Sequence, residues 1–430
     1  MGKSRHERQQ QLSSKGDVSH APGVKGQQSL RGRTAALIGI LLVALSARQA
    51  VSAVSPLLPA IGGELPFSAL SVGVLGMLPT AGFALMGFLA VPLIRRIELE
   101  HLLLASIVLA TLGQVGRALG WTIPLFLLLT GIAMLGLGLV NVVMPPLLMK
   151  YFPDKAGLLA ALHITLLAVS TALAAQLATP LANLSGWRFS IGIWAGISAA
   201  AAIPWMILLS RGRRVTRIKS SSSSQPSPRA PQIKPWKSSI GWGAALVFAG
   251  CSSNTFAAIT WLPTVLVDRG LSHEAGGSML AIYSIIGLPT GLIVPLLVVK
   301  MQRPLPLAIL FAAMFAAGYG GIMFAPLGSA AIWVIVAGLG QGAYSFAFTM
   351  INKRARTPGG SGALSGFAQG VGYTFACLGP VLFGLLHHPG DNWVPSFGML
   401  GVWLLVLTAG AIMINAPRVL EDASGSRSSR

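Results

Sequence analysis

The chain has 430 residues, of which 53% are hydrophobic and only 10% are charged, and its mean hydropathy is +0.70. A soluble domain is about 25% charged, so this chain lacks the charges needed to cover a water-exposed surface. Its two cysteines, Cys251 and Cys377, lie in apolar runs and form neither a disulfide framework nor a metal-binding pattern. The composition excludes a soluble enzyme, a secreted disulfide-rich protein and a disordered protein, and it predicts an integral membrane protein.

Twelve apolar runs are long enough, at roughly 18 to 25 residues, to cross a bilayer as α-helices. A polar segment separates the first six runs from the last six. The predicted fold is therefore an all-α membrane protein with 12 transmembrane helices in two six-helix halves. In chain order, the predicted spans are 35–61, 70–94, 102–119, 123–148, 158–181, 191–209, 242–266, 279–299, 306–324, 330–351, 363–386 and 394–414.

Positive charge is distributed unequally between the predicted loops. Of the 31 Lys and Arg residues, 27 fall in the two tails and in the loops on one side, whereas Arg117, Arg188 and Arg269 fall on the other side and Arg48 lies inside the first span. Because cytoplasmic loops are enriched in Lys and Arg, both termini are predicted to be cytoplasmic, in a bacterial inner (cell) membrane. The net charge of +20 therefore reflects topology. Without interleaved aromatic residues it does not indicate a nucleic-acid partner.

Polar segments flank and join the two halves. Residues 1–34 form a predicted disordered cytoplasmic tail without a signal-peptide pattern, and residues 416–430 form a second cytoplasmic tail. Residues 211–239 are basic and contain five consecutive serines followed by four prolines, which is typical of a linker. The N-terminal half is thus predicted at 35–210 and the C-terminal half at 240–415.

The two halves share short sequence matches. Leu78-Pro79-Thr80 in the second span is repeated as Leu288-Pro289-Thr290 in the eighth. Gly136-Leu137-Gly138 in the fourth span is repeated as Gly338-Leu339-Gly340 in the tenth. Matches in corresponding spans are typical of transporters built from two parallel repeats, which bind substrate near the membrane midplane between the halves.

Several motifs resemble those of one transporter family. They are Ser55-Pro56-Leu57-Leu58-Pro59, Met144-Pro145, Gly186-Trp187-Arg188, Trp261-Leu262-Pro263-Thr264, Gly270-Leu271-Ser272, Gly338-Leu339-Gly340-Gln341-Gly342, Arg354-Ala355-Arg356-Thr357-Pro358, Ala368-Gln369-Gly370-Val371-Gly372-Tyr373, Gly379-Pro380 and Trp393. On these residues the chain resembles the cyanate and nitroimidazole permease family (CynX/NimT) of the major facilitator superfamily. The resemblance implies a cyanate-like anion or a planar, nitroimidazole-like compound as the substrate.

The sequence departs from the family pattern at three places. The family's Arg-Pro pair in the first span appears here as Arg48-Gln49, and His163 stands where an aromatic residue is expected. The loop after the second span, Arg95-Arg96-Ile97-Glu98, is a degenerate form of the superfamily's loop motif and lacks its aspartate. The first two departures bear on the identity of the substrate and not on the fold.

Two arginines are candidates for binding an anion. All 11 Asp and Glu residues lie in tails, loops or span ends, so the apolar interior offers no carboxylate partner. Arg48 lies at the centre of the first span, where an unpaired cation costs at least about 2.5–3.5 kcal/mol. It is expected to face water or an anion, with Ser52 on the same helix face; alternatively, it is a structural residue bonded to helix carbonyls. Arg117, near the outer end of the third span, either attracts substrate or snorkels to the headgroups.

Neutral polar and aromatic residues complete the predicted substrate site. Individually, the amides suit helix–helix packing; together, they could orient a small planar substrate against aromatic rings. For one of them, Trp261, the alternative is a place in the interfacial belt. These residues are Asn141, Asn254, Trp261, Gln341, Tyr344, Gln369 and Tyr373. His163, the only imidazole in the apolar interior, is either the proton carrier or a hydrogen-bonded packing residue.

The sequence therefore predicts a secondary active transporter, not an enzyme, which moves a small anionic or planar electron-rich solute by alternating access. Coupling is expected to be to protons or to exchange. The alternative is a multidrug or toxic-compound exporter of the same fold, although export of cationic drugs usually needs a membrane carboxylate. A receptor and an anion channel fit the short tails and the repeat less well. No cofactor or metal is predicted; the expected partners are a small-molecule substrate, the lipid bilayer and protons, with the chain working as a monomer by family analogy.

Overall fold

In a computed structural model of the chain, every regular element of the described residues is a helix, which confirms the predicted all-α class. The structure describes residues 30–152, 155–212, 234–387 and 392–425. The N half comprises α2 (Leu30–Ser46), α3 (Gln49–Ser52), the short 3₁₀ helix η1 (Ser55–Leu57), α4 (Leu58–Gly62), α5 (Ala69–Arg96), α6 (Leu99–Leu119), α7 (Ile123–Tyr151) and α8 (Ala156–Gly212). The C half comprises η2 (Pro235–Lys237), α9 (Ser239–Asp268), α10 (His273–Ile285), α11 (Gly287–Lys300), α12 (Leu305–Phe324), η3 (Leu327–Ser329), α13 (Ala330–Leu339), α14 (Gly342–Lys353), α15 (Pro358–Ala376), α16 (Leu378–Leu385), α17 (Val394–Ile414) and α18 (Leu420–Gly425).

The helices account for the twelve predicted membrane crossings. Eleven stretches of the described residues are long and apolar enough to span a membrane, and one of them, Leu162–Ser210, has 49 residues. As a straight helix it would be about 74 Å long, more than twice the thickness of the hydrocarbon core. Instead, α8 folds back at Ser185 and Gly186, where Gly186 has φ +83°, and the Ser190 hydroxyl donates to the Ala178 carbonyl on the other arm at 2.7 Å. This stretch therefore supplies two crossings.

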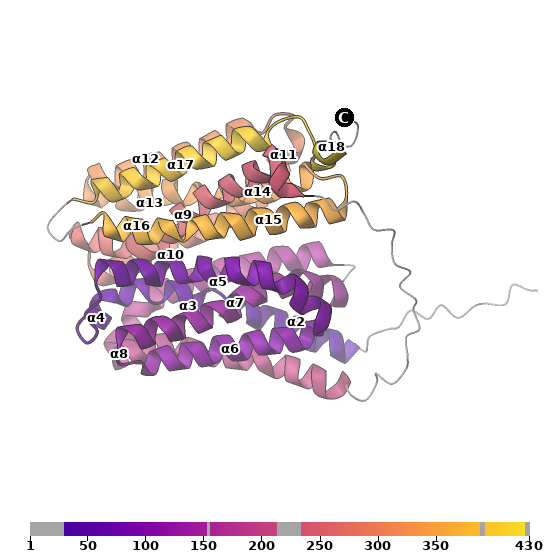
Figure 1. The fold of residues 1–430 in the computed structure, drawn as a ribbon. Coiled ribbons are helices and arrows are strands. Elements are labelled where there is room, and N and C mark those ends of the chain that lie inside the picture. Colours follow the sequence, from indigo (N-terminus) through magenta and orange to yellow (C-terminus); the bar gives the residue numbers. More distant parts are fainter. Residues whose placement is uncertain (1–29, 153–154, 213–233, 388–391, 426–430) are drawn as a thin grey trace, which may run out of the picture.

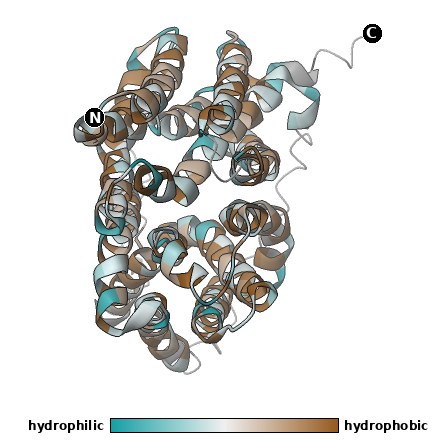
Figure 2. Ribbon diagram, turned by 90° about the vertical axis from the view of Figure 1, so that its left-hand side faces the viewer, coloured by the Kyte–Doolittle hydropathy of each residue, from teal (hydrophilic) through white to brown (hydrophobic). Residues whose placement is uncertain are grey.

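The two halves lie against each other as two groups of roughly antiparallel helices (Figures 1 and 2). Helix α5 of the N half packs against α15 and α16 of the C half, and α8 packs against α10. The start of α2 and the C-terminal helix α18 lie at one end of the molecule, called here the termini end (Figure 1). The opposite end, which carries α4 and the end of α9, is called the far end.

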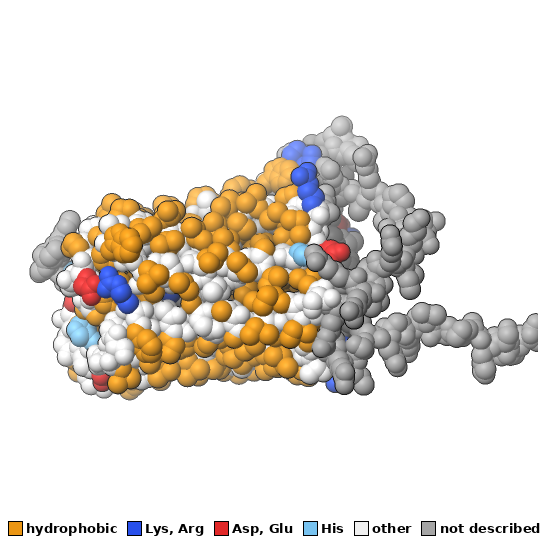
Figure 3. Space-filling model, turned by 90° about the horizontal axis from the view of Figure 1, so that it is seen from below, with side chains coloured by type: hydrophobic (Ala, Val, Ile, Leu, Met, Phe, Trp, Pro, Cys, Tyr) orange, Lys and Arg blue, Asp and Glu red, His pale blue; other side chains and the backbone are white. Residues whose placement is uncertain are grey.

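The surface between the two ends is apolar. On the face shown in Figure 3, hydrophobic side chains cover the middle of the molecule and charged side chains gather toward its ends. Large apolar side chains are exposed along this belt, such as Leu112 at 62%, Val299 at 69% and Leu405 at 71%. In water such exposure would be costly, so the belt marks the surface that contacts lipid.

The motif Gly186-Trp187-Arg188 forms a turn at the far end. Gly186 takes a conformation open essentially only to glycine, and this brings Trp187 and Arg188 to Glu64 on the loop after α4. The Trp187 indole donates to Glu64 at 3.0 Å, and Arg188 forms an ion pair with the same carboxylate. Hydrogen bonds from Arg188 and Trp187 hold the pKa of Glu64 below its usual value.

The motif Arg354–Pro358 ties three helices together at the termini end. The Arg354 guanidinium donates to the carbonyls of Ile414 and Asn415 at the end of α17, both at 2.8 Å. In α18, Glu421 accepts hydrogen bonds from the backbone N–H groups of Arg356 and Thr357 and from the Thr357 hydroxyl, at the start of α15. The sequence predicted residues 416–430 only as a tail, without this docked helix.

Two of the predicted polar segments fall mostly outside the described residues. Of the predicted tail 1–34, residues 1–29 are not described, and of the predicted linker 211–239, residues 213–233 are not described. The last residues of the linker form η2, where the Trp236 carbonyl accepts a hydrogen bond from the Trp242 indole of α9 at 3.0 Å.

The repeat is visible in equivalent contacts. Thr80 in α5 donates to the Met77 carbonyl and Thr290 in α11 donates to the Gly287 carbonyl, both at 2.8 Å, so the Leu-Pro-Thr match corresponds to one local structure. The Gly-Leu-Gly match is different. Gly136 approaches α6 at Ala110, whereas in the C half Gly340 and Gly342 approach α12, at Phe315 and Phe311. The two Gly-Leu-Gly segments therefore do not make equivalent contacts.

Candidate substrate site

The first membrane span is broken at its centre. Helix α2 ends at Ser46 and α3 begins at Gln49, with Ala47 and Arg48 in a turn between them. Side chains of neighbouring helices satisfy carbonyls on both sides of the break: Ser170 of α8 donates to Leu45, and Arg117 of α6 donates to Ala50 at 2.6 Å. Such replacement is what allows a helix to be interrupted within a membrane.

Arg48 stands at this break and lies near residues of both halves. It interacts electrostatically with His163 on α8 of the N half, and with Tyr344 on α14 and Tyr373 on α15 of the C half. Arg48, Tyr344 and Tyr373 are half-buried, although they lie in the middle of their spans. Among the described residues no ion pair involves Arg48. The cation therefore lies near both halves, and no carboxylate of the described residues is paired with it.

Aromatic rings surround the two tyrosines. The Phe248 ring lies 6.0 Å from that of Tyr344 and 6.1 Å from that of Tyr373, both edge-on. From the N half, Phe83 contacts Tyr373 edge-on at 5.5 Å. The Tyr344 hydroxyl is hydrogen-bonded to the Ser252 hydroxyl of α9 at 2.9 Å. The arrangement offers ring faces and hydroxyl groups beside a cation, which suits a small planar solute.

His163 is held close to Arg48 but is not tied by a hydrogen bond at one of its nitrogens. Its side chain is 7% exposed, and within the described chain its Nδ1 has no hydrogen-bond partner. A structural histidine buried among apolar side chains normally has its ring nitrogens paired. The free nitrogen leaves a hydrogen-bonding position that a proton or a substrate atom could occupy.

The other predicted site residues have mixed surroundings. The amide of Gln341, which lies in the break between α13 and α14, donates to the Tyr283 carbonyl of α10 at 2.7 Å. The Gln369 amide donates to Ser365 of its own helix at 2.8 Å. Asn254 is fully buried and donates to the Gly250 carbonyl one turn earlier at 2.8 Å. Asn141 is exposed on α7. Ser52 is fully buried and donates to the Arg48 carbonyl at 3.3 Å.

Trp261 belongs to a packed aromatic group in the C half. Its ring is 4% exposed and lies 6.0 Å from the Phe383 ring and 5.8 Å from the Trp393 ring. Its indole donates to the Pro380 carbonyl at 3.0 Å. Trp261 therefore does not stand in a lipid-facing belt, and nothing in its contacts links it to Arg48.

Arg117 is fully buried, with 0% exposure. Its side chain points into the N half, where it bonds Ala50 and lines a small cavity together with Ser55, Thr130 and Thr260. The snorkelling alternative is thus wrong for this conformation. The three residues that interact with Arg48 do not line this cavity, so the structure places the two arginines at different sites.

The halves touch closely at one level toward the far end, called here the far-end contact. It consists of Ser55, Gly73 and Gly76 of the N half against Thr260, Pro380 and Val381 of the C half. The Ser55 hydroxyl donates to the Thr260 carbonyl at 2.6 Å. A Cβ atom on Gly73 would lie 2.8 Å from Val381 Cα, and one on Gly76 would lie 2.4 Å from Thr260 Oγ1.

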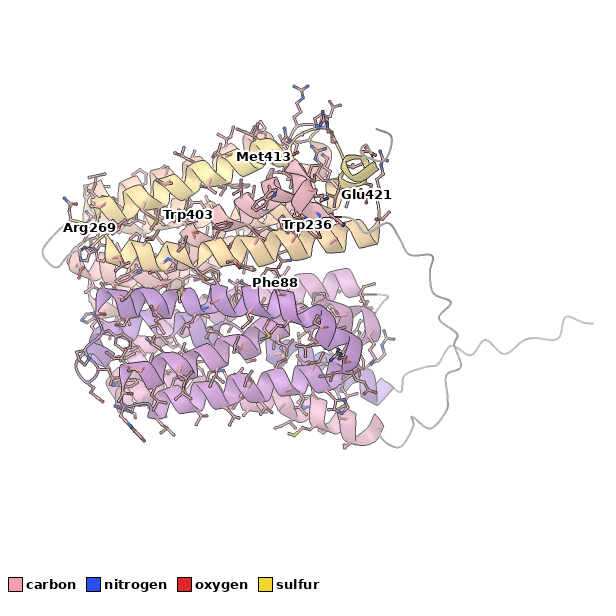
Figure 4. All side chains as sticks on the ribbon, in the orientation of Figure 1. Phe88, Trp236, Arg269, Trp403, Met413 and Glu421 are labelled. Carbon is pink, nitrogen blue, oxygen red and sulfur yellow. The ribbon has the colours of Figure 1, made fainter. Side chains whose placement is uncertain are left out.

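A second approach between the halves lies toward the termini end. Phe88 of α5 stands at the seam between the halves (Figure 4). Its ring Cζ would lie 2.8 Å from a Cβ atom on Gly370 of α15. Here a flexible side chain makes the contact, and the Phe88 side chain is 56% exposed, so this seam is closed less tightly than the far-end contact.

Sequence reasoning missed several of these residues. Ser252, Phe83, Phe248 and Thr260 carry no motif, and a phenylalanine or a serine is unremarkable in an apolar helix. Pro56 and Pro59, which remove backbone donors, signal the later interruption of this span after α3, but not the turn at Ala47 and Arg48. Among the described residues, no group of three or more His, Cys, Asp or Glu side chains could hold a metal ion.

Comparison with known proteins relates the chain to membrane transporters. The sequence profile of the Major Facilitator Superfamily matches residues 40–384. The 2-nitroimidazole transporter of Escherichia coli (strain K12) is 30% identical over 88% of this chain and 95% of its own. The cyanate transport protein CynX of the same organism is 24% identical over 89% and 98%. Among solved structures, a bacterial homolog of the human lysosomal transporter Spinster, in an inward-facing and occupied conformation, matches 90% of this chain and 95% of its own, with a TM-score of 0.67 at 14% identity.

Proposed function

The chain belongs to the Major Facilitator Superfamily, and on that premise we propose that it is a secondary active transporter of a small anionic or planar electron-rich solute. The resemblance to the cyanate and nitroimidazole permeases is confirmed by the two relatives of those names. A cyanate-like anion and a nitroimidazole-like ring are therefore the first substrates to test. Export of toxic compounds by the same fold is the alternative.

One observation carries the proposal: Arg48, at the break in the first span, has no ion-pair partner among the described residues and lies near two tyrosines of the opposite half. A cation at membrane depth needs a partner, and the described spans offer no carboxylate beside it. A small anion would neutralise the guanidinium and accept its parallel N–H groups. The rings of Tyr344 and Tyr373 would then lie beside a flat substrate, and the Tyr344 hydroxyl would supply a donor.

Alternating access follows from the origin of these residues. Arg48 and His163 belong to the N half, and Tyr344 and Tyr373 belong to the C half, so rocking of the halves separates or joins the two sides of the site. In the present conformation the far-end contact closes one route. Separation of the halves at that contact would open the site to the far end, and their approach at the opposite end would close it toward the termini end.

Transport of a charged substrate has an electrical cost. Moving a monovalent anion into a negative-inside cell costs about 2.3 kcal/mol per 100 mV, so uptake needs a co-transported proton or exchange against another anion. His163 is the proposed proton carrier because it is an imidazole within the apolar spans, a group that titrates near neutral pH, and its Nδ1 has no hydrogen-bond partner among the described residues. We place the termini end in the cytoplasm of a bacterial inner membrane, as the loop charges predict, with the chain acting as a monomer.

The test measures ligand-dependent thermal stability of the purified protein. The panel holds cyanate, nitrate, small carboxylates, 2-nitroimidazole and cationic drugs, with wild type, Arg48→Gln and Tyr373→Phe. A ligand at about 100 times its Kd stabilises the folded state by about 2.7 kcal/mol. We expect stabilisation by a small anion or a nitroimidazole in wild type, and its loss in Arg48→Gln.

The matched control is Arg303→Gln, which removes the same charge from an exposed loop residue and should leave the stabilisation intact. Equal stabilisation of wild type and Arg48→Gln would make Arg48 structural and would refute the anion site. Stabilisation by cationic drugs alone would favour the exporter alternative.

The role of His163 is tested separately in proteoliposomes. His163→Gln keeps a polar side chain of similar length but does not titrate. We expect this variant to lose the response of net transport to a pH gradient while keeping exchange of internal for external substrate. Unchanged pH dependence of net transport would show that the proton is carried elsewhere, for example by the substrate itself.

A further inference from the structure

The cavity beside Arg117 is a second place where a buried charge lacks a partner. Arg117 is fully buried, and its Nη1 donates a hydrogen bond to the Ala50 carbonyl. Within the part of the chain that the structure describes, its Nε and Nη2 have no hydrogen-bond partner. No carboxylate of the described residues forms an ion pair with it. Both a charge and two donors are therefore left without compensation.

The size of the cavity limits what can occupy it. It has about 20 Å³ of space for water-sized particles, which is room for at least one of them. The candidates are therefore a water molecule and a small anion, of which a halide is the simplest.

The chemistry of the lining favours the anion. The hydroxyl groups of Thr130 and Thr260 each donate to a carbonyl of their own helix at 2.7 Å, and the Ser55 hydroxyl donates to the Thr260 carbonyl. The free donors are therefore those of the guanidinium. A water molecule would accept from them but would leave the positive charge buried without a counter-ion, which is the costly arrangement. A halide accepts from the same N–H groups and also neutralises the charge.

The cavity is built by both halves. Thr260 belongs to α9 of the C half, whereas Arg117, Ser55 and Thr130 belong to the N half. Thr260 is also the residue that Ser55 holds across the far-end contact. The cavity therefore has its present lining only while the far end is closed.

From these observations we infer that the Arg117 cavity is a halide site, occupied by a single chloride-sized anion when the far end is closed, and separate from the substrate site at Arg48. Binding there favours the closed far end, because a ligand shifts a conformational equilibrium toward the state that binds it better. Chloride would thus act as a ligand that regulates the conformation and not as the transported solute.

The experiment compares chloride with gluconate, which is too large for the cavity, at constant ionic strength and without substrate. The thermal midpoint of the purified full chain is measured for wild type, Arg117→Gln and Arg48→Gln. We expect chloride to raise the midpoint of wild type and of Arg48→Gln saturably, and to leave that of Arg117→Gln unchanged. An equal rise in Arg117→Gln, or no rise in wild type, would overturn the inference.

Crystals of the wild type grown in bromide give a readout that does not depend on the folding of a variant. Anomalous scattering should show one bromide between Arg117 and Thr260, and its absence from that cavity would also overturn the inference. Failure of the substrate proposal would appear elsewhere, as equal substrate stabilisation of wild type and Arg48→Gln, so the two outcomes are distinguishable.

Discussion

Substitution of Gly73 by alanine tests the idea that the far-end contact opens during the working cycle. Gly73 lies on α5, where that helix packs against α16. A Cβ atom there would lie 2.8 Å from Val381 Cα, 3.1 Å from the Pro380 carbonyl oxygen and 3.3 Å from the Val381 carbonyl oxygen. All three neighbours are backbone atoms, so no side chain can rotate away and one half must move.

The size of the effect follows from the cost of overpacking, which is about 1–3 kcal/mol for one added carbon in a tight interface. If the contact exists only when the far end is closed, the whole cost falls on that state. The ratio of closed to open molecules should then fall by about 5- to 150-fold. Gly87→Ala is the matched control, because Gly87 lies on the same helix and a Cβ atom there meets nothing within 4 Å.

Distances between spin labels on the two halves report the opening. Leu184 and Phe324 are exposed at 78% and 76% near the far end and accept labels through introduced cysteines, with Cys251 and Cys377 replaced by alanine. Gly73→Ala should lengthen the Leu184–Phe324 distance relative to wild type and to Gly87→Ala. Identical distance distributions in all three proteins would refute the reasoning, because the strain would then have been absorbed without opening.

Three further predictions concern the motifs at the ends of the molecule. Arg354→Gln removes two charged hydrogen bonds to the end of α17 and should destabilise the protein by about 1.5–3 kcal/mol, read as a fall in the thermal midpoint; an unchanged midpoint would contradict the role. Burial raises the pKa of Glu421, but hydrogen bonds from the start of α15 outweigh it and hold the pKa below its ordinary value of 4.5. The stabilisation by the Glu421 carboxylate is therefore complete above that value and is lost as the pH falls below it. Glu421→Gln should thus flatten the curve of thermal midpoint against pH in acid. A curve parallel to that of wild type would contradict this role of Glu421. Gly186→Ala should cost about 1–3 kcal/mol because of the positive φ, whereas Gly196→Ala on the same helix, with nothing within 4 Å, should cost nothing measurable.

The fold could be predicted from the sequence because bilayer physics leaves few choices. A run of about 20 apolar residues has to be helical in lipid, so counting such runs gives the architecture. The prediction was less informative where a helix is interrupted. Nothing around Ala47 and Arg48 signals a turn, because the interruption depends on Ser170 and Arg117, more than a hundred and more than sixty residues away, which satisfy the released carbonyls.

The charge at the candidate site could be predicted from the sequence, but the residues that surround this charge could not. Arg48 stands out because an unpaired arginine in an apolar run needs an explanation. The sequence could not show that Tyr344 and Tyr373 face it while Trp261 packs elsewhere, since all three are aromatic residues in apolar spans. The same holds for the amides of Gln369 and Asn254. Each donates to its own helix, and only packing decides whether an amide side chain turns inward.

Arg117 shows why depth along a helix is a poor guide to the role of a charge. Its place near the end of α6 suggested that it could reach the headgroups, yet it turns inward to the Ala50 carbonyl. Ala50 lies two residues after Arg48, so the Arg117 side chain helps to fix the turn that presents Arg48. Separation of Thr260 from Ser55 at the far-end contact would change the cavity that Arg117 lines. If Arg48 binds the substrate as proposed, the Arg117 guanidinium lies between that site and the far-end contact, and a ligand held by it would act on both.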